Sequence, residues 1–179
     1  MVSRYMYLAV LILWSLSNRV GWAVGNSANQ LESAGLSPKT YHGAWFDIEY
    51  PSDFRVKIIQ FSSTKSDGSA DAVEFVSPDN SVTFYIFSPQ WGGNAPEIKL
   101  IPLVEKMSTK TIVKSKKGTV TLYTIESNNK FYIRSYQDFV SNDGDIHWVV
   151  GVKYKDINSY NMHKQQYLRF KSSLRQYAD

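Results

Sequence analysis

The stretch that decides the fold runs from Ala72 to Gly93 and reads AVEFVSPDNSVTFYIFSPQWGG. It contains two apolar, β-rich runs, Val73–Val76 and Val82–Phe87, separated by the sequence Ser-Pro-Asp-Asn-Ser. Proline presets one turn dihedral, and Asp and Asn tolerate a tight bend, so the stretch predicts a β-hairpin. The second run is almost wholly apolar, which is typical of a strand covered on both faces. We therefore expect this hairpin to form the core against which the rest of the chain packs.

An aromatic residue beside a glycine pair follows the second run, in the sequence Trp91-Gly92-Gly93. Aromatic side chains on a loop bring a large contact area at low entropic cost. We therefore take Trp91, Gly92 and Gly93 as the candidate ligand-binding or partner-binding residues, with Tyr85 and Trp45 as neighbours. The alternative is that Trp91 folds back and covers the core, and the sequence leaves both interpretations open.

The N-terminus has the features of a secretory signal. Arg4 precedes the apolar run Tyr5–Leu16, which has the length of a signal core and is shorter than the roughly 20 residues that a membrane span needs. Small residues follow, so we predict a signal peptide over residues 1–25. An uncleaved anchor is the alternative, because Val20–Val24 could lengthen the apolar segment.

The remaining chain is predicted to be a flexible polar linker over residues 26–41 and a single domain over residues 42–177. A chain of 179 residues is long enough to bury a sizeable core. Removing the signal takes away two of the 20 basic residues and none of the 16 acidic ones, which leaves a net charge of +2. This balance does not predict a nucleic-acid partner. The absence of cysteine excludes disulfides, thiolate metal sites and cysteine nucleophiles.

Outside the hairpin, further strands are predicted from alternation and turn residues. Two of them precede the hairpin, Trp45–Tyr50 and Phe54–Phe61. Four more follow it and predict an antiparallel meander: Thr109–Lys114, Thr119–Glu126, Phe131–Val140 and Ile146–Lys155. The intervening segment Asn94–Ser108 predicts two short pieces or a helix that begins near Pro102, because proline removes a hydrogen bond inside a helix.

A C-terminal helix closes the chain. The carboxylate of Asp156 can accept the free amide hydrogens of its first turn. Apolar and aromatic residues recur at steps of three and four, which predicts one face that packs on the sheet; they are Tyr160, His163, Tyr167, Phe170 and Leu174. The basic residues of this helix and of the preceding turns are interpreted as solvated surface, with anionic lipid or an acidic protein as the alternative.

Catalytic and metal-binding patterns are not recognisable in the sequence. No two of the three histidines, His42, His147 and His163, have metal-ligand spacing. For His163 a partly buried core position is expected, and for His147 an outward-facing strand position. The alternative for His147 is a hydrolase role together with Asp145, which would need partners that sequence cannot reveal. We therefore expect no enzyme activity, no metal and no cofactor.

The run Phe46–Val56, FDIEYPSDFRV, resembles the opening signature of PsbP-like domains, which is an aromatic-x-Ile-x-Tyr-Pro strand end followed by a small residue, Asp and an aromatic. The meander after Thr109 and the closing helix with Phe170 and Ser172-Ser173-Leu174 are also similar to that family. The resemblance spans His42–Gln176. It implies an α+β sandwich, a central antiparallel sheet with flanking helices, and it implies accessory or binding proteins that share no catalytic residues.

These observations together predict an exported, non-catalytic accessory or binding protein, secreted or periplasmic. Its expected partner is an envelope protein or a small ligand, with membrane contact only through the signal segment if that segment is uncleaved. The alternative is a small secreted hydrolase or ligand carrier with a cleft near Trp91.

Overall fold

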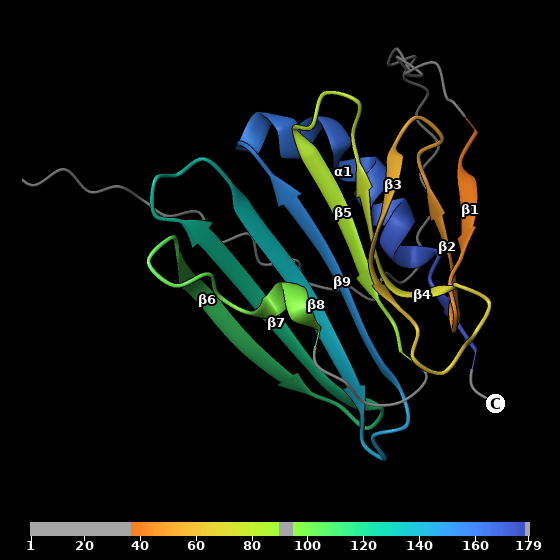
Figure 1. Ribbon diagram of the computed structural model, residues 1–179. Coiled ribbons are helices and arrows are strands. Elements are labelled where there is room, and N and C mark those ends of the chain that lie inside the picture. Colours follow the sequence, from red (N-terminus) through yellow and green to blue (C-terminus); the bar gives the residue numbers. More distant parts are fainter. Residues whose placement is uncertain (1–36, 90–94, 178–179) are drawn as a thin grey trace, which may run out of the picture. The chain divides into compact units, whose positions relative to one another are not determined.

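The computed structural model describes residues 37–89 and 95–177, which form ten strands, one α-helix and one 3₁₀ turn (Figure 1). In chain order the elements are β1 (Lys39–His42), β2 (Phe46–Tyr50), β3 (Arg55–Phe61), β4 (Ala70–Val76), β5 (Val82–Phe87), η1 (Pro96–Ile98), β6 (Glu105–Lys114), β7 (Gly118–Ser127), β8 (Ile133–Ser141), β9 (His147–Tyr154), α1 (Ile157–Ser172) and β10 (Arg175–Gln176).

The main sheet has seven antiparallel strands in the order β3-β4-β5-β9-β8-β7-β6. The predicted hairpin is confirmed as β4 and β5, with Phe75 opposite Phe84. β5 then pairs with β9, where Phe84 lies opposite Val152, and this pairing places the hairpin beside the predicted meander. The meander is also confirmed, as β6 to β9. Short turns between consecutive runs are what dictate this antiparallel order.

A second, three-stranded sheet has the order β1-β2-β10. Residues 39–41, which the sequence predicts to belong to the linker, form part of β1 and pair with β2, so the predicted linker boundary at residue 41 is wrong. The broad α+β class is confirmed. The expectation of one central sheet with several flanking helices is not, because there are two sheets and α1 is the only α-helix of residues 37–89 and 95–177.

Helix α1 begins where the sequence predicts, with Asp156 as its N-cap. The Ser159 amide donates to Asp156 Oδ1 at 2.8 Å, which satisfies one of the free donors of the first turn. Tyr167 and Phe170 are buried and belong to the core that α1 forms with β2, β5 and β9. Phe170 lies 5.2 Å, between ring centroids, from Phe84 of the predicted hairpin. No helix among these described residues is long and apolar enough to cross a bilayer.

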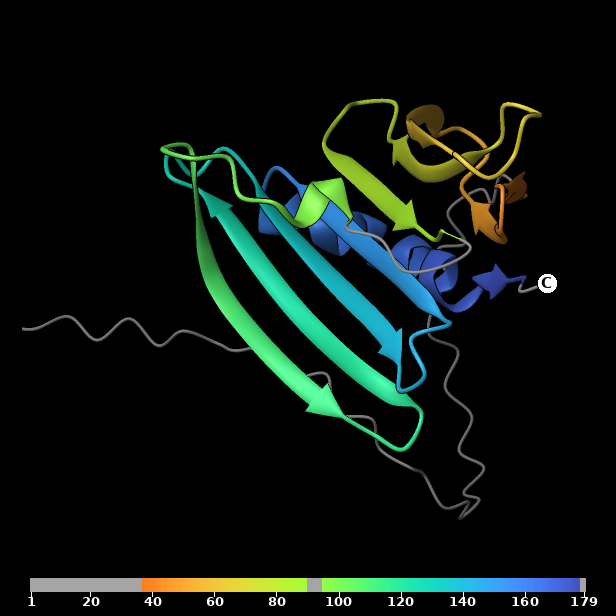
Figure 2. The same cartoon turned by 60° about the horizontal axis from the view of Figure 1, so that its bottom comes forward.

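The opposite face of the main sheet carries η1 and the segment around it, as Figures 1 and 2 show. Ile98 and Leu100 pack there on a second core that includes Tyr85, Tyr136 and Val149. The prediction of a helix that begins near Pro102 is wrong, because the chain enters β6 at Glu105. Pairing with β7, which involves nine of the ten residues of β6, outweighs the local helix propensity.

Strands β6 to β8 extend beyond the area that α1 covers (Figures 1 and 2). After Glu105, every residue of β6 is exposed. The end of the sheet at which β6 begins also contains the β7–β8 turn and the start of α1, because Ser127 lies opposite Glu105 and Ile133 lies opposite Tyr154.

Candidate functional site

Only two of the residues that the sequence predicts as a site, Trp45 and Tyr85, lie in the described part of the structure, and they have different neighbours. Trp91, Gly92 and Gly93 lie outside the described residues. Trp45 is buried, its Nε1 donates to Thr64 Oγ1 at 2.9 Å, and the Lys65 ammonium lies 4.1 Å from its ring centroid.

Tyr85 is buried in a different set of contacts, in the second core. Its ring meets that of Tyr136 edge to face at 5.8 Å. Burial raises the pKa of Tyr85 above its usual range. Trp45 and Tyr85 are therefore packing residues in the described structure, and neither offers a free aromatic surface.

His147 is buried, so the expected outward-facing position is wrong. Its ring meets Phe87 edge to face at 5.5 Å between centroids, and its Nε2 lies 3.0 Å from Asp138 Oδ1 on β8. The carboxylate partner is thus Asp138 and not Asp145. Among the described residues no hydroxyl lies within hydrogen-bond distance of the ring, which leaves the pair without the nucleophile that triad chemistry needs.

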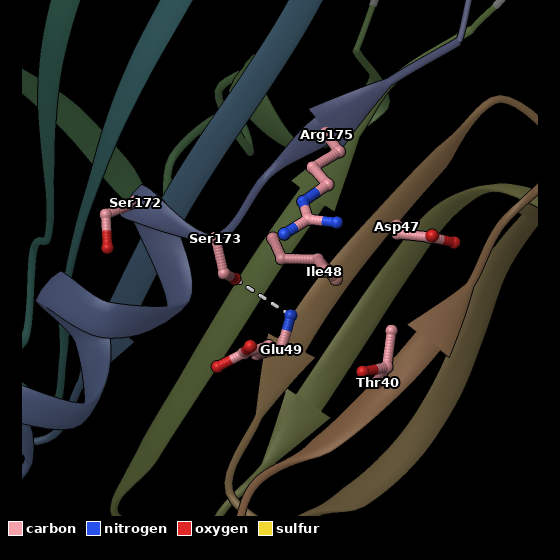
Figure 3. A pocket seen from close by; sticks show the side chains of 7 residues that line it. All are labelled: Thr40, Asp47, Ile48, Glu49, Ser172, Ser173 and Arg175. Atoms are coloured by element: carbon pink, nitrogen blue, oxygen red, sulfur yellow. Dashed lines mark hydrogen bonds between the residues drawn. The ribbon is translucent and has the colours of Figure 1, made fainter.

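A small cavity of about 180 Å³ lies where the three-stranded sheet meets the C-terminal end of α1 (Figure 3). It is lined by the strand residues Thr40, Asp47, Ile48, Glu49 and Arg175, and by Ser172 and Ser173 at the end of α1. Ligand pockets usually measure 300–1,000 Å³, so this cavity is below the usual size.

The polar groups around this cavity bond mainly to one another. The Ser173 hydroxyl donates to the Phe170 carbonyl and accepts from the Glu49 amide, both at 2.8 Å. Arg169 Nε donates to Glu49 Oε2 at 3.0 Å, and His42 Nδ1 lies 2.6 Å from Asp47 Oδ1. The contacts of Ser173 and Arg169 with Glu49 connect the end of α1 to β2, and the contact of His42 with Asp47 connects β1 to β2. We therefore assign the cavity a structural role.

A stronger candidate is built on a buried ion pair in the outer strands. Arg134 of β8 and Glu105 of β6 have side chains that are 5% and 1% exposed. The guanidinium donates twice to the carboxylate, from Nε to Oε1 at 2.8 Å and from Nη2 to Oε2 at 2.5 Å. Such two-pronged pairs are directional as well as strong. We call Arg134, Glu105 and Tyr132 the clamp.

The clamp holds the chain that leads into β6. Arg134 donates to the carbonyls of Glu97 and Lys99, the latter at 2.9 Å. Glu105 Oε2 accepts the Ile101 amide at 2.8 Å, and its Oε1 accepts the Tyr132 hydroxyl at 2.8 Å. One buried ion pair thereby fixes both the segment before β6 and the β7–β8 turn.

Both members of the ion pair are held in their charged forms. Burial alone would raise the pKa of Glu105, but hydrogen bonds from Arg134, the Ile101 amide and Tyr132 outweigh it and hold the pKa below its usual value. Burial would lower the pKa of Arg134, and its bonds to Glu105 raise it instead. The pair is therefore ionised in the folded protein at neutral pH.

The two loops that the clamp fixes expose large apolar side chains. Leu103 is 97% exposed and Phe131 is 71% exposed, and Ile101 and Val104 are exposed as well. Asn128 joins the two loops. Its backbone N–H donates to the Val104 carbonyl at 2.7 Å, and its side-chain Nδ2 donates to the Leu103 carbonyl at 2.9 Å. Figures 1 and 2 both show these loops side by side. We call Ile101, Leu103, Val104 and Phe131 the apolar tip.

Leu103 has a backbone conformation that leucine rarely adopts, with φ of 66°. This left-handed conformation costs a residue other than glycine about 1–2 kcal/mol. The side chain recovers none of this cost by burial, because it is almost fully exposed. Folding alone therefore does not account for a leucine at this position.

Sequence reasoning missed the apolar tip for identifiable reasons. Leu103 and Val104 fall in the segment Asn94–Ser108, for which the sequence predicts two short pieces or a helix that begins near Pro102. Phe131 is the first residue of the predicted strand Phe131–Val140. The one available signal is the turn sequence Ser127-Asn128-Asn129-Lys130 directly before Phe131, which places an aromatic residue at the edge of a turn.

No protein-family model matches the sequence, and no curated protein matches it. Among solved structures, the chain is similar to cyanobacterial PsbP (CyanoP) from Synechocystis sp. PCC 6803, at 8% identity over 87% of this chain and 98% of that one, with a TM-score of 0.47. It is also similar to the Ran-binding protein Mog1p of Saccharomyces cerevisiae, at 7% identity over 80% of this chain and 97% of that one, with a TM-score of 0.42. Neither similarity assigns a role to a residue.

Proposed function

We propose that the chain is an exported, non-catalytic binding protein that recognises its partner through the apolar tip. The observation that carries this proposal is Leu103, an exposed leucine in a strained backbone conformation that a buried ion pair holds in place. Strain that folding does not explain is typical of functional positions. Export is supported by the apolar run Tyr5–Leu16 behind Arg4.

The surroundings of the apolar tip support binding by a preformed surface. Exposed apolar side chains that gather on one part of a surface are typical of interaction sites. Because the clamp already fixes both loops, little conformational entropy remains to be lost on binding, and preorganisation of this kind raises affinity. The absence of catalytic activity stays part of the proposal, and we base it on the lack of a nucleophile beside His147 in the described residues.

Because Leu103 has a strained backbone conformation, Leu103→Asn is expected to leave the stability of the protein unchanged or to improve it. Asparagine tolerates the left-handed conformation, so the free energy of unfolding should rise by up to about 1 kcal/mol. Leu122→Asn is the matched control, because Leu122 is an exposed leucine in a regular strand, β7, where asparagine is unfavourable. Urea denaturation of both variants measures the difference. A Leu103→Asn variant that loses as much stability as Leu122→Asn would contradict the argument.

The binding role can be tested with single-cysteine variants, because the natural chain has no cysteine. Phe131→Cys places a benzophenone label on the apolar tip. Phe61→Cys is the matched control. Phe61 is 62% exposed and ends β3, the edge strand on the other side of the main sheet from β6. It lies at the end of the sheet away from the apolar tip. Each labelled protein is irradiated in an envelope fraction of its source cells.

We expect an adduct of discrete mass, with protein or with lipid, from position 131 and not from position 61. The adduct should be lost when Leu103→Asn is added to the Phe131→Cys chain. Equal labelling from both positions, or labelling that Leu103→Asn does not change, would exclude the apolar tip as the recognition site.

A further inference from the structure

We infer that the partner of the apolar tip is the surface of a lipid bilayer that carries anionic headgroups, an inference that rests on the proposed binding role of the tip. Exposed lysines surround it: Lys99 and Lys106 on the segment before and within β6, and Lys130 beside Phe131. Anionic lipid surfaces attract basic residues placed near apolar ones, and each lysine near the surface adds to the affinity.

The acidic residues of the same loops offset this charge only in part. Glu105 is buried in the clamp. Glu97 of η1 is partly buried, and the partly exposed Glu126 has one carboxylate oxygen 3.8 Å from Lys106 Nζ. Lys99 and Lys130 are without an ion-pair partner among residues 37–89 and 95–177. The two loops therefore carry an excess of positive charge around their apolar side chains.

The start of α1 adds to the same end of the molecule. Ile133 pairs with Tyr154, so the first turn of α1 follows directly beside the β7–β8 turn, as Figure 1 shows. Ile157 is exposed there, as is Lys155. The acidic neighbour Asp156 is engaged as the helix cap. The combination of apolar and basic side chains thus continues beyond the two loops.

The form of the tip favours a bilayer over a protein partner. Leu103 and Phe131 are 97% and 71% exposed, so most of each side chain projects into solvent from the loops that the clamp fixes. Fluid acyl chains close around a single projecting side chain without a preformed pocket, while the flexible lysine side chains keep their ammonium groups among the headgroups. We therefore expect Leu103 and Phe131 to insert into the bilayer interface while the lysines around them stay among the headgroups.

The first test follows the environment of the tip itself. An environment-sensitive fluorophore is attached to Phe131→Cys or, as control, to Phe61→Cys in the full chain. Vesicles of phosphatidylglycerol mixed with phosphatidylcholine should brighten and blue-shift the label at position 131, and salt should weaken this response. The label at position 61 should not respond, and phosphatidylcholine vesicles should give little signal at either position. Because the readout is local, an apolar N-terminal segment in the same chain does not obscure it.

The second test asks whether vesicle binding depends on the lysines beside the apolar tip or only on the total charge of the protein. In the labelled Phe131→Cys chain, Lys99→Gln combined with Lys130→Gln should weaken vesicle binding about 25-fold, since each lysine near the surface contributes about fivefold. Lys116→Gln combined with Lys117→Gln removes the same charge from the β6–β7 turn, at the other end of the sheet, and should leave the affinity unchanged. Circular dichroism checks that both variants are folded.

Several outcomes would overturn the inference: no response at position 131, an equal response at position 61, an equal response to phosphatidylcholine alone, or an equal loss from the Lys116 and Lys117 variant. The failure of this inference is distinguishable from the failure of the proposed function. If vesicles give no response while the benzophenone at position 131 forms a discrete protein adduct, the tip is a recognition site for a protein. If both experiments fail, the binding role of the tip falls as well.

Discussion

Replacement of Arg134 by Met is expected to lower the free energy of unfolding by about 3–5 kcal/mol, as the loss of one partner of a buried ion pair does. The Glu105 side chain is only 1% exposed, so its carboxylate would remain buried without a counter-charge. The carbonyls of Glu97 and Lys99 would lose their donor as well. Chemical denaturation followed by tyrosine and tryptophan fluorescence measures the change.

Two control variants make this prediction specific. Arg169→Met breaks an ion pair with Glu49 in which both side chains are exposed, and pairs of that kind contribute only about 0–1 kcal/mol. In the double variant Arg134→Met with Glu105→Gln, the glutamine oxygen can still accept from the Ile101 amide, and its NH2 group can donate to the Tyr132 hydroxyl oxygen. The double variant should therefore be more stable than Arg134→Met alone. If Arg134→Met and Arg169→Met lose the same stability, the ion pair does not hold the fold.

The clamp also relates stability to the proposed binding role. The segment before β6 is fixed through contacts of Arg134 and Glu105 with Glu97, Lys99 and Ile101. A clamp variant that is still folded should therefore bind vesicles more weakly through loss of preorganisation. The Leu103→Asn variant should instead lose binding with no loss of stability. Loss of both stability and binding therefore identifies residues that support the apolar tip, and loss of binding alone identifies residues of the tip that contact the partner.

The elements that the sequence predicts correctly are those that short-range patterns determine. The β4–β5 hairpin follows from two apolar runs and the turn sequence between them, and the meander from turn residues at regular intervals. The N-cap follows from Asp156, which needs only a hydrogen bond three residues away. Each of these features depends on residues that are close together in the chain.

The clamp and the apolar tip depend instead on contacts between distant residues. Arg134 and Glu105 are 29 positions apart, and the sequence gives no reason to pair them. The same pairing explains why the expected helix near Pro102 is absent, since β7 and Arg134 together hold Glu105 in a strand. The exposure of Leu103 and Phe131 follows from this arrangement. The second sheet escapes prediction for a similar reason, because β10 pairs with β2 from the other end of the chain.

Acid should destabilise the protein through the same ion pair. The pKa of Glu105 is held below its usual value of 4.5 in the folded state. Between the folded and unfolded pKa values the unfolded chain binds more protons at this residue, so the free energy of unfolding falls as the pH decreases below about 4.5. Protonation would also leave Arg134 charged and buried without its partner. The stabilisation is fully present above the unfolded pKa and is lost as the pH falls through the folded one.

The double variant Arg134→Met with Glu105→Gln removes this contribution, because it lacks the titrating carboxylate. Other shifted groups remain in both proteins, and loss of the Arg134 charge raises the pKa of Glu97 further in the double variant. The pKa of Asp79 is lowered to about 2 by hydrogen bonds from Ser77 and Ser81, so Asp79, like Glu105, makes the folded protein less stable as the pH falls. The pKa of Glu97 is raised by burial, so Glu97 has the opposite effect on stability. Urea denaturation between pH 3 and pH 7 should therefore give a steeper acid loss of stability for the natural chain than for the double variant. Parallel pH profiles would mean that Glu105 has the same pKa in the folded and unfolded chains, and that the clamp is not an ion pair that the fold stabilises.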